Sequence, residues 1–206
     1  MGRALIPELT RYGHRVLALV RENSVSKLPP ACEPIVGNPL DEKTFANAVP
    51  RGCTFVQLVG VAHPSPRKAK QFREIDLVSV RESVAVASAA KVAHFVYLSV
   101  AQPAPMMKEY IAVRAEGEAM IRNAGLRATF LRPWYVLGPG HHWPYALLPF
   151  YWICKCFPAT REGALRLGLV TLRQMIAALL HAVENPPENG LRIVGVPEIR
   201  VTTPLH

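Results

Sequence analysis

The sequence predicts an α/β fold in which a largely parallel, doubly wound sheet is covered by helices on both faces. Short apolar runs that suit buried strands alternate with helical patterns along most of the chain. The length of 206 residues fits one domain, and 50% of the residues are hydrophobic, which is enough for a substantial core. One apolar run also ends in a loop of small residues at Gly60, where open α/β sheets bind ligands.

The first part of the chain is expected to begin with a helix and then to alternate. The expected elements are a helix over 2–12, strands over 15–20 and 34–36, a helix over 42–48 and a strand over 54–61. Leu5, Ile6 and Leu9 share one face of the first helix, and Gly13 can end it in a left-handed conformation. Asp41 is a suitable cap for the second helix.

The remaining elements continue the alternation. They are a helix over 71–90, a strand over 95–100, a helix over 108–124, strands over 128–131 and 168–170, a helix over 172–184 and a strand over 192–196. Gly125 stops the helix over 108–124, and Pro186 with Pro187 stops the helix over 172–184. Strands and helices at this spacing favour a parallel sheet.

The charge pattern argues against nucleic acid as a partner. The net charge is +9, but lysine and arginine are spread among apolar residues and form neither a basic stripe nor a known motif. The tightest basic group, 67–73, runs directly into Glu74 and Asp76, as expected for a solvated face. A bound anionic ligand explains the basic charge at least as well.

The cysteines and the apolar stretches bear on location and metal binding. The spacing of Cys32, Cys53, Cys154 and Cys156 shows neither a disulfide framework nor a second zinc-ligand pair, so we expect a reducing, cytoplasmic setting and no metal site. The apolar stretch 143–154 is too short to span a bilayer and is broken by prolines, so no transmembrane helix is expected.

Tyr110 and Arg114 are the first candidates for chemistry. Positions four residues apart on a helix share one face, so the phenol and the guanidinium are expected to be neighbours. A positive charge beside a phenol favours its ionised form, which suits a group whose proton must move. A surface tyrosine and arginine on an amphipathic helix remain the alternative interpretation.

Four short motifs follow one another along the chain, and their order and spacing are informative together. They are Val20-Arg21, Tyr97-Leu98-Ser99, Tyr110-(x)3-Arg114-Ala-Glu-Gly-Glu118, and Leu131-Arg132-Pro133 through Gly138-Pro139-Gly140. Together they resemble the short-chain dehydrogenase/reductase superfamily, in its atypical, NmrA-like and epimerase-like branch. The resemblance implies a single Rossmann-like NAD(P)-binding domain over 1–206, with a nucleotide-binding core at 1–140 and a small C-terminal substrate lobe at 141–206.

The resemblance also implies roles for individual residues. Tyr110 matches the tyrosine that exchanges a proton with substrate, Arg114 stands where active members carry lysine, and Ser99 matches a hydroxyl that can bind a substrate oxygen. Ser99 can equally be a strand-end serine that satisfies backbone groups. The implied cofactor-binding residues are Gly2, Arg21, Asn38, Gly60, Val61, Ala62 and Pro133.

Arg21 bears on the choice of cofactor. An arginine after this strand can accommodate the 2′-phosphate of NADP, which makes NADP the expected cofactor, with NAD possible. A solvated arginine is the alternative. Tyr135 is expected beside Pro133 near the nicotinamide, and the aromatic and imidazole side chains that follow would face the substrate or pack between lobe and sheet. Those further residues are Trp134, His141, His142 and Trp143.

The start of the chain departs from the family pattern. Family members open with a strand and a glycine-rich turn, whereas Gly2 stands at what would be the last of those glycines. Phosphate affinity should therefore be weaker, and the strands on either side of the missing one should have unpaired edges. We expect either a natural start upstream of Met1 or a truncated, inactive copy.

Three functions follow from this sequence. The first is an NADP-dependent oxidoreductase or epimerase-like enzyme that acts on a small organic substrate. The second is a non-catalytic nucleotide-binding regulatory or scaffold protein, such as a redox sensor or a complex I accessory-like protein, which Arg114 and the absent turn favour. The third is a quinone- or membrane-associated accessory protein, which rests on the charge and the aromatic stretch 143–157 but lacks an amphipathic face.

Overall fold

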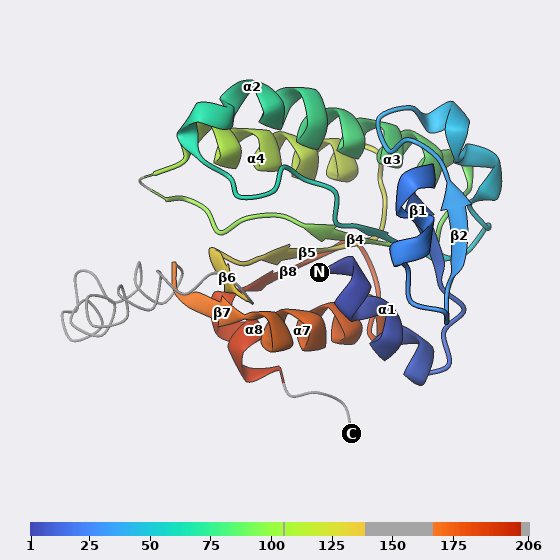
Figure 1. Ribbon diagram of the computed structural model, residues 1–206. Helices are drawn as coiled ribbons and strands as arrows, with labels where there is room; N and C mark the ends of the chain where they lie inside the picture. The colour runs from blue at the N-terminus through green and yellow to red at the C-terminus, as the bar shows by residue number, and fades with distance from the viewer. Residues whose placement is uncertain (105, 139–166, 203–206) are drawn as a thin grey trace.

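The computed structural model describes residues 1–104, 106–138 and 167–202, and it confirms the predicted α/β fold. The largest sheet has four strands in the order β3-β4-β5-β8, and neighbouring strands are parallel. These strands are β3 (Thr54–Gln57), β4 (His94–Leu98), β5 (Ala128–Arg132) and β8 (Leu191–Gly195). Figure 1 shows them running through the centre of the molecule.

Two smaller parallel pairs accompany this sheet. β1 (Leu17–Val20) pairs with β2 (Glu33–Val36), and β6 (Tyr135–Leu137) pairs with β7 (Leu169–Thr171). The expected single sheet is thus divided into three groups of strands among the described residues. β6 was not expected, because the segment after Pro133 reads as a loop rich in proline and glycine.

Helices cover both faces of the four-stranded sheet (Figure 1). On one face lie α3 (Val78–Ala89) and α4 (Lys108–Asn123), and on the other lie α1 (Gly2–Arg11), α7 (Leu172–Glu184) and the short α8 (Val196–Val201). α1 buries Leu5, Ile6 and Leu9 as expected, and Gly13 follows it with a φ of 84°. The predicted helix stop is therefore confirmed.

Two hydrophobic clusters arise from the alternation of side chains along the strands. In β4, Phe95 and Tyr97 pack with α3 and α4, whereas Val96 packs with α1 and α7. β5 follows the same rule with Phe130 on one side and Leu131 on the other. Both faces of the central strands are buried, which explains the unbroken apolar run 95–98 in β4 and the adjacent Phe130 and Leu131 in β5.

The helix expected over 42–48 is wrong. That segment forms two short 3₁₀ turns, η2 (Glu42–Thr44) and η3 (Ala46–Ala48). The buried Phe45 between them has a φ of −141°, which interrupts helical geometry. The hydroxyl of Thr44 also donates to the carbonyl of Asp41 at 2.7 Å, while Asp41 accepts from the backbone N–H of Lys43, as expected of a cap.

The helix expected over 71–90 is present but is not uniform. It consists of α2 (Ala69–Gln71), a π-helical segment η5 (Phe72–Leu77) and α3, with a 3₁₀ turn η4 (Pro66–Lys68) before it. The π-helical segment buries Phe72 and Asp76. Such segments are rare and are found mostly at functional sites, where they redirect side chains.

The division into a core at 1–140 and a lobe at 141–206 stays a prediction. β8 comes from the second part of the chain and pairs with β5 of the first part over five residues. α7 also contacts α1 and packs on the central strands. The described part of 141–206 therefore completes the sheet and one of its helical layers.

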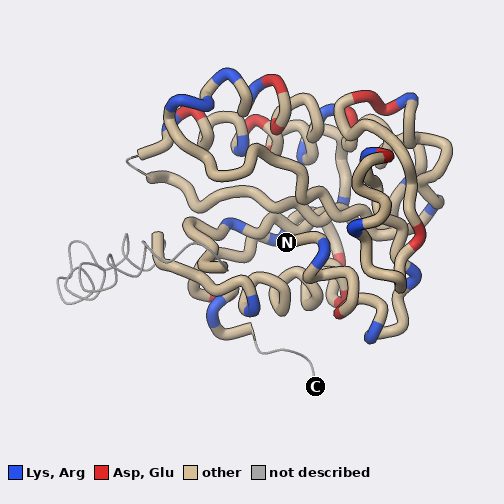
Figure 2. The backbone as a smooth tube through the Cα atoms, viewed as in Figure 1, with Lys and Arg blue, Asp and Glu red and all other residues tan. Residues whose placement is uncertain are grey.

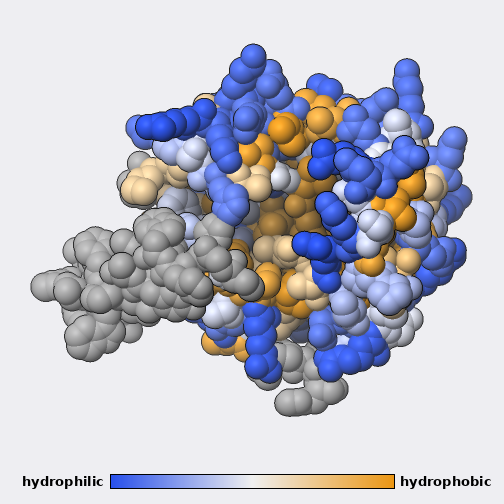
Figure 3. All heavy atoms as spheres, in the orientation of Figure 1, coloured by the Kyte–Doolittle hydropathy of each residue, from blue (hydrophilic) through white to orange (hydrophobic). Residues whose placement is uncertain are grey.

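A gap in the sheet lies between β1 and β3. Among the described residues, β1 pairs only with β2 and β3 only with β4, so each has one edge without a strand partner, as expected from the sequence. A cavity of about 750 Å³ lies between these edges and the apolar face of α1. In the space-filling view of the same face, hydrophobic side chains line a hollow whose rim is hydrophilic (Figure 3).

The charges of the described residues form no single basic stripe. In the view of Figure 2, lysine and arginine lie on several helices and loops, and acidic residues are interspersed with them on the helices that cover the upper face. Arg73 of η5, for example, lies 2.5 Å from Glu109 and 3.6 Å from Glu116 of α4. Exposed pairs of this kind add little stability.

Candidate functional site

The predicted cofactor residues lie at the carboxyl ends of the parallel strands. Arg21 directly follows β1, Asn38 lies just beyond β2, and the loop Gly60–Ala62 follows β3. Ser99 and Pro133 directly follow β4 and β5. Carboxyl ends of parallel strands meet at one edge of each sheet, which is the usual ligand edge of an open α/β fold.

These residues differ in their exposure. Arg21, Asn38, Gly60 and Ala62 are exposed, whereas Pro133 is buried and its carbonyl accepts the backbone N–H of Ala101 at 2.9 Å. Val61 is half-buried and Gly2, in the first turn of α1, lines the cavity. All of these cofactor assignments stay predictions.

A buried ion pair lies directly beneath the loop that follows β3. Arg114 of α4 and Asp76 of η5 are 4% and 0% exposed, and Nη2 of Arg114 donates to Oδ1 of Asp76 at 2.5 Å. Nη1 of Arg114 also donates to the carbonyl of Leu98, at the end of β4, at 3.0 Å. One arginine therefore joins α4, η5 and β4.

The same carboxylate fixes the loop. The backbone N–H of Val61 donates to Oδ2 of Asp76 at 2.8 Å. Gly60 is needed here because a Cβ at this position would overlap Nη2 of Arg114. Burial raises the pKa of Asp76 above its ordinary value, although the charge of Arg114 and the Val61 N–H favour the ionised carboxylate.

Tyr110 is the neighbour that the helical spacing predicts. The guanidinium carbon of Arg114 lies 5.2 Å from the centre of the Tyr110 ring, within the range of a cation–π contact. The ring also packs at 5.0 Å from that of Phe72 in η5. Tyr110 is half-buried, so ring packing holds it while part of the residue stays accessible.

A second tyrosine approaches the same guanidinium. The ring of Tyr97 in β4 is fully buried, and its centre lies 5.7 Å from the guanidinium carbon of Arg114. Burial raises the pKa of Tyr97 to about 12, although the nearby arginine charge opposes this. Gly117 of α4 makes room for the phenol, since a Cβ there would lie 2.7 Å from its oxygen. Tyr97 therefore stays protonated and serves as a core residue.

Ser99 belongs to a different polar group. Its side chain is buried, and its hydroxyl donates to Oε1 of Glu118 at 2.6 Å. Glu118 also accepts two hydrogen bonds from Arg132, at 2.9 and 2.5 Å, and one from Gln102 at 3.2 Å. This bidentate pair links the end of β5 to α4. The contacts of Ser99 and those of Tyr110 thus lead to different partners.

Sequence reasoning missed the contribution of Asp76. The charge pattern places it on a solvated face, whereas it is fully buried against Arg114. Its sequence neighbours are the signal for burial, because Asp76 stands between Ile75 and Leu77 on the apolar side of a helical pattern. Glu118 was visible in the motif that begins at Tyr110, but its hydrogen bond to Ser99 depends on the fold.

Several predicted residues lie outside the described residues. They are Pro139, Gly140, His141, His142, Trp143, Cys154 and Cys156, together with the stretch 143–157. Within the described ranges, no cluster of three or more histidine, cysteine, aspartate or glutamate side chains could hold a metal ion. Within the same ranges, every helix is too short or too polar to cross a membrane.

Comparison with known proteins adds to this geometry. A family model described as NAD(P)H-binding matches residues 1–141. A search of curated proteins found no match to the sequence.

Solved structures share the fold of the chain. Three of them are the protein gox2253 at 20% identity, a UDP-galactose 4-epimerase at 18%, and a short-chain dehydrogenase/reductase superfamily protein from Agrobacterium tumefaciens with bound NAD at 17%. Each superposes with a TM-score of 0.67 over 94% of this chain. The chain spans 66%, 73% and 74% of their respective lengths. At these identities the likeness shows the fold alone.

Proposed function

Because the chain belongs to the NAD(P)H-binding family, we propose that it binds an NADP-type dinucleotide at the carboxyl ends of its strands. The observation that supports this best is the exposed loop Gly60–Ala62 after β3, which Asp76 anchors from below through the N–H of Val61. Small residues let a ligand approach the backbone, and an anchored loop loses little freedom when a ligand binds.

The chemistry of the neighbouring residues fits such a ligand. The exposed guanidinium of Arg21 suits the 2′-phosphate that distinguishes NADP from NAD. The side-chain carbonyl of Asn38 accepts the N–H of Leu40 at 3.1 Å, so its amide NH₂ points to another partner and suits the adenine side of the ligand. The first turn of α1, at Gly2, offers helix N–H groups to a phosphate.

We further propose that the protein is an NADP-dependent oxidoreductase or epimerase-like enzyme on a small organic substrate. A bound nicotinamide cofactor would supply hydride transfer. Tyr110 would give or take the proton at its phenol oxygen, and the guanidinium carbon of Arg114 lies 5.2 Å from the centre of its ring. Nη1 and Nη2 of Arg114 already donate to the Leu98 carbonyl and to Asp76, which fixes the guanidinium beside the Tyr110 ring.

Ser99 has a narrower role in this proposal. Its hydroxyl hydrogen is engaged with Glu118 at 2.6 Å, so toward a substrate it can act as an acceptor. It would orient a substrate hydroxyl and would not donate to a carbonyl. Cys32 and Cys53 are free thiols, which agrees with the reducing, cytoplasmic setting that we propose for the protein.

One observation favours a second candidate function, a nucleotide-binding protein without catalysis. The cation that replaces lysine is buried in a structural ion pair beneath Gly60. A compact ammonium could reach a ribose, whereas this guanidinium already donates to Asp76 and to the Leu98 carbonyl. A regulatory or scaffold protein would keep the nucleotide site and lose the turnover.

Binding and turnover can be tested separately. Thermal denaturation with millimolar NADPH, NADP and NADH should show stabilisation that is largest for the NADP forms, because a ligand that binds the native state stabilises it by mass action. Arg21→Glu should reverse that preference. Glu22→Arg, which changes the charge at the adjacent position, is the matched control. Stabilisation by none of the three nucleotides would contradict the proposal.

Turnover decides between the enzyme and the non-catalytic protein. Tyr110→Phe should abolish NADPH oxidation with small carbonyl substrates while it leaves nucleotide binding nearly intact. Tyr12→Phe, which removes a phenol at the end of α1 that lies away from Gly2, is the control. Binding without any turnover in the unmodified protein would favour the regulatory function.

A further inference from the structure

Two side chains hold the loop after β3 at alternate residues. The N–H of Val59 donates to Oε1 of Gln57 at 3.3 Å. The N–H of Val61 donates to Oδ2 of Asp76 at 2.8 Å. One anchor comes from β3 and the other from η5, so the loop is restrained both from the sheet and from the helix that crosses beneath it.

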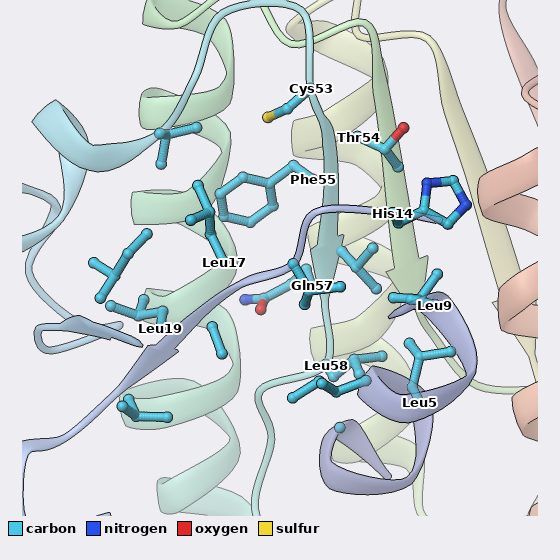
Figure 4. A pocket seen from close by; sticks show the side chains of 18 of the residues that line it. Leu5, Leu9, His14, Leu17, Leu19, Cys53, Thr54, Phe55, Gln57 and Leu58 are labelled. Carbon is cyan, nitrogen blue, oxygen red and sulfur yellow. The ribbon is translucent and has the colours of Figure 1, made fainter. Parts of the chain in front are cut away.

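Gln57 is itself held in place. It is 2% exposed, and its Nε2 donates to the hydroxyl of Ser79 at 3.2 Å. The Ser79 hydroxyl in turn donates to the backbone carbonyl of Asp76 at 2.9 Å. Figure 4 shows Gln57 and Phe55 on one side of β3 and Thr54 on the other. The two anchors of the loop are therefore joined to each other through Ser79.

The N–H groups between and beyond these anchors are available. Among the described residues, the N–H groups of Gly60 and Ala62 have no hydrogen-bond partner, and both residues are exposed. The Ala62 carbonyl accepts from Nζ of Lys68 at 2.6 Å, which fixes the far end of the loop. In extended backbone, successive residues face opposite sides. With the N–H groups of Val59 and Val61 turned toward the protein, those of Gly60 and Ala62 are directed to solvent.

We propose that Gln57 and Asp76 are positioning residues for the nucleotide, because they turn the N–H groups of Gly60 and Ala62 toward it as a pair of donors. This inference rests on the proposed nucleotide binding and specifies its chemistry. The pair takes acceptor oxygens of the ligand. Residues two apart are separated by about 6.6 Å in extended backbone, so each donor binds an oxygen of its own.

Removal of an anchor should weaken nucleotide binding. Gln57→Met keeps the length of the side chain and removes both of its hydrogen bonds, so the loop must lose more freedom when the ligand binds. The Kd for NADPH, measured by fluorescence titration, should rise about three- to tenfold. Asp76→Asn, whose side chain can accept on one side only, should act in the same direction.

A buried polar residue far from the loop provides the control. Thr129→Val on β5 removes the hydrogen bond to His94 and should leave the Kd for NADPH unchanged. An equal rise in Gln57→Met and Thr129→Val would show a general loosening of the core and would overturn the positioning role.

The donors themselves can be observed in the unmodified full chain. Residue-specific amide exchange, measured by NMR, should be slower at Val59 and Val61 than at Gly60 and Ala62 in the free protein, because only the first two are hydrogen-bonded. Saturating NADPH should slow exchange at Gly60 and Ala62 by about tenfold or more, as expected when each gains a hydrogen bond.

Deletion of one donor completes the test. Ala62→Pro removes an N–H and should raise the Kd for NADPH about tenfold, whereas Ala62→Gly keeps the N–H and should change it little. Binding of NADPH without protection of Gly60 and Ala62 would overturn this inference and leave the proposed nucleotide binding intact. If the unmodified protein binds none of the nucleotides, both are wrong. The exchange measurement needs no variant, so it decides even where Gln57→Met or Ala62→Pro does not fold.

Discussion

At the scale of single residues, Arg114 shows how one substitution changes the character of a site. A planar guanidinium can bind a carboxylate and a carbonyl together, and Arg114 does so with Asp76 and Leu98. A lysine ammonium at this position would be a point charge with a shorter reach. The arginine thus couples the proton-transfer candidate Tyr110 to the loop after β3.

Removal of only one partner of the Arg114–Asp76 pair should destabilise the protein strongly. Arg114→Met or Asp76→Leu leaves an uncompensated charge in the core and should lower the free energy of unfolding by about 3–5 kcal/mol. The double variant should lose much less than the sum of the two. Urea unfolding of the four proteins, analysed as a double-mutant cycle, measures this coupling.

An exposed pair in the same region provides the control. Arg73 lies 2.5 Å from Glu109, but the two side chains are 53% and 40% exposed. Arg73→Met should therefore change stability by no more than about 1 kcal/mol. Strict additivity of Arg114→Met and Asp76→Leu would show that the buried pair is not coupled.

Gly60 should be intolerant of even one methyl group. Gly60→Ala places a Cβ on Nη2 of Arg114 and should destabilise the protein by about 1–3 kcal/mol, as overpacked sites do. Removal of the obstructing guanidinium in Arg114→Met should make the same substitution clearly less costly, because only the approach to Oδ1 of Asp76 at 3.1 Å remains. Gly2→Ala, whose Cβ would lie 4.0 Å from Leu58, serves as the control in urea unfolding. An equal cost of Gly60→Ala in both backgrounds would contradict this prediction.

At the scale of elements, β4 and β5 carry a buried histidine that links stability to pH. His94 is 1% exposed and contacts the hydroxyl of Thr129 through Nε2 at 3.0 Å. Burial, and then the charges of Arg127 and Arg192, lower its pKa from 6.5 to about 4. The native protein therefore keeps this imidazole neutral in a range where the unfolded chain protonates it.

Stability should consequently fall as the pH drops from about 6.5 to about 4. In that window the unfolded state binds a proton that the native state does not, and the loss attributable to His94 should reach about 3 kcal/mol. His94→Gln can keep a hydrogen bond to Thr129 and cannot titrate, so it should flatten this part of the curve. The free energy of unfolding of both proteins is measured with urea at a series of pH values. If it falls in parallel for the two proteins, His94 is not the group responsible.

The elements also show what can be predicted from this sequence. β4, β5 and α7 are long, strongly patterned segments, and their predicted types are confirmed. The segment 42–48 has a cap and helix-forming residues, yet the packing of Phe45 decides its conformation. Tertiary contacts of this kind leave no local signal.

The candidate site follows the same division. Family motifs and strand ends point to Ser99, Tyr110 and Arg114 as candidates, because these signals depend only on order along the chain. The pairing of Arg114 with Asp76, and of Ser99 with Glu118, depends on which helix crosses which strand end. That information is absent from local patterns, so both acidic partners could be assigned only from the fold.

At the scale of the whole molecule, the cavity divides the sheet into parts of unequal stability. β4 is buried and paired on both edges, by β3 and β5, whereas β1 is paired on one edge and β2 is largely exposed. Local opening is easiest where few buried contacts must be broken. The β1–β2 unit should therefore open at a lower free energy than the rest of the sheet.

Amide hydrogen exchange measured by mass spectrometry checks this division. Peptides that cover β1 and β2 should exchange well before those that cover β4 and β5, because opening of the first unit leaves the second intact. Ala18→Phe fills part of the cavity and should slow exchange in β1–β2 without changing β4–β5. Ala112→Phe on α4 should change neither region. Equal protection across all four strands would mean that the two parts unfold together despite the cavity, and that contacts of α1 with both sides outweigh the missing strand pairing.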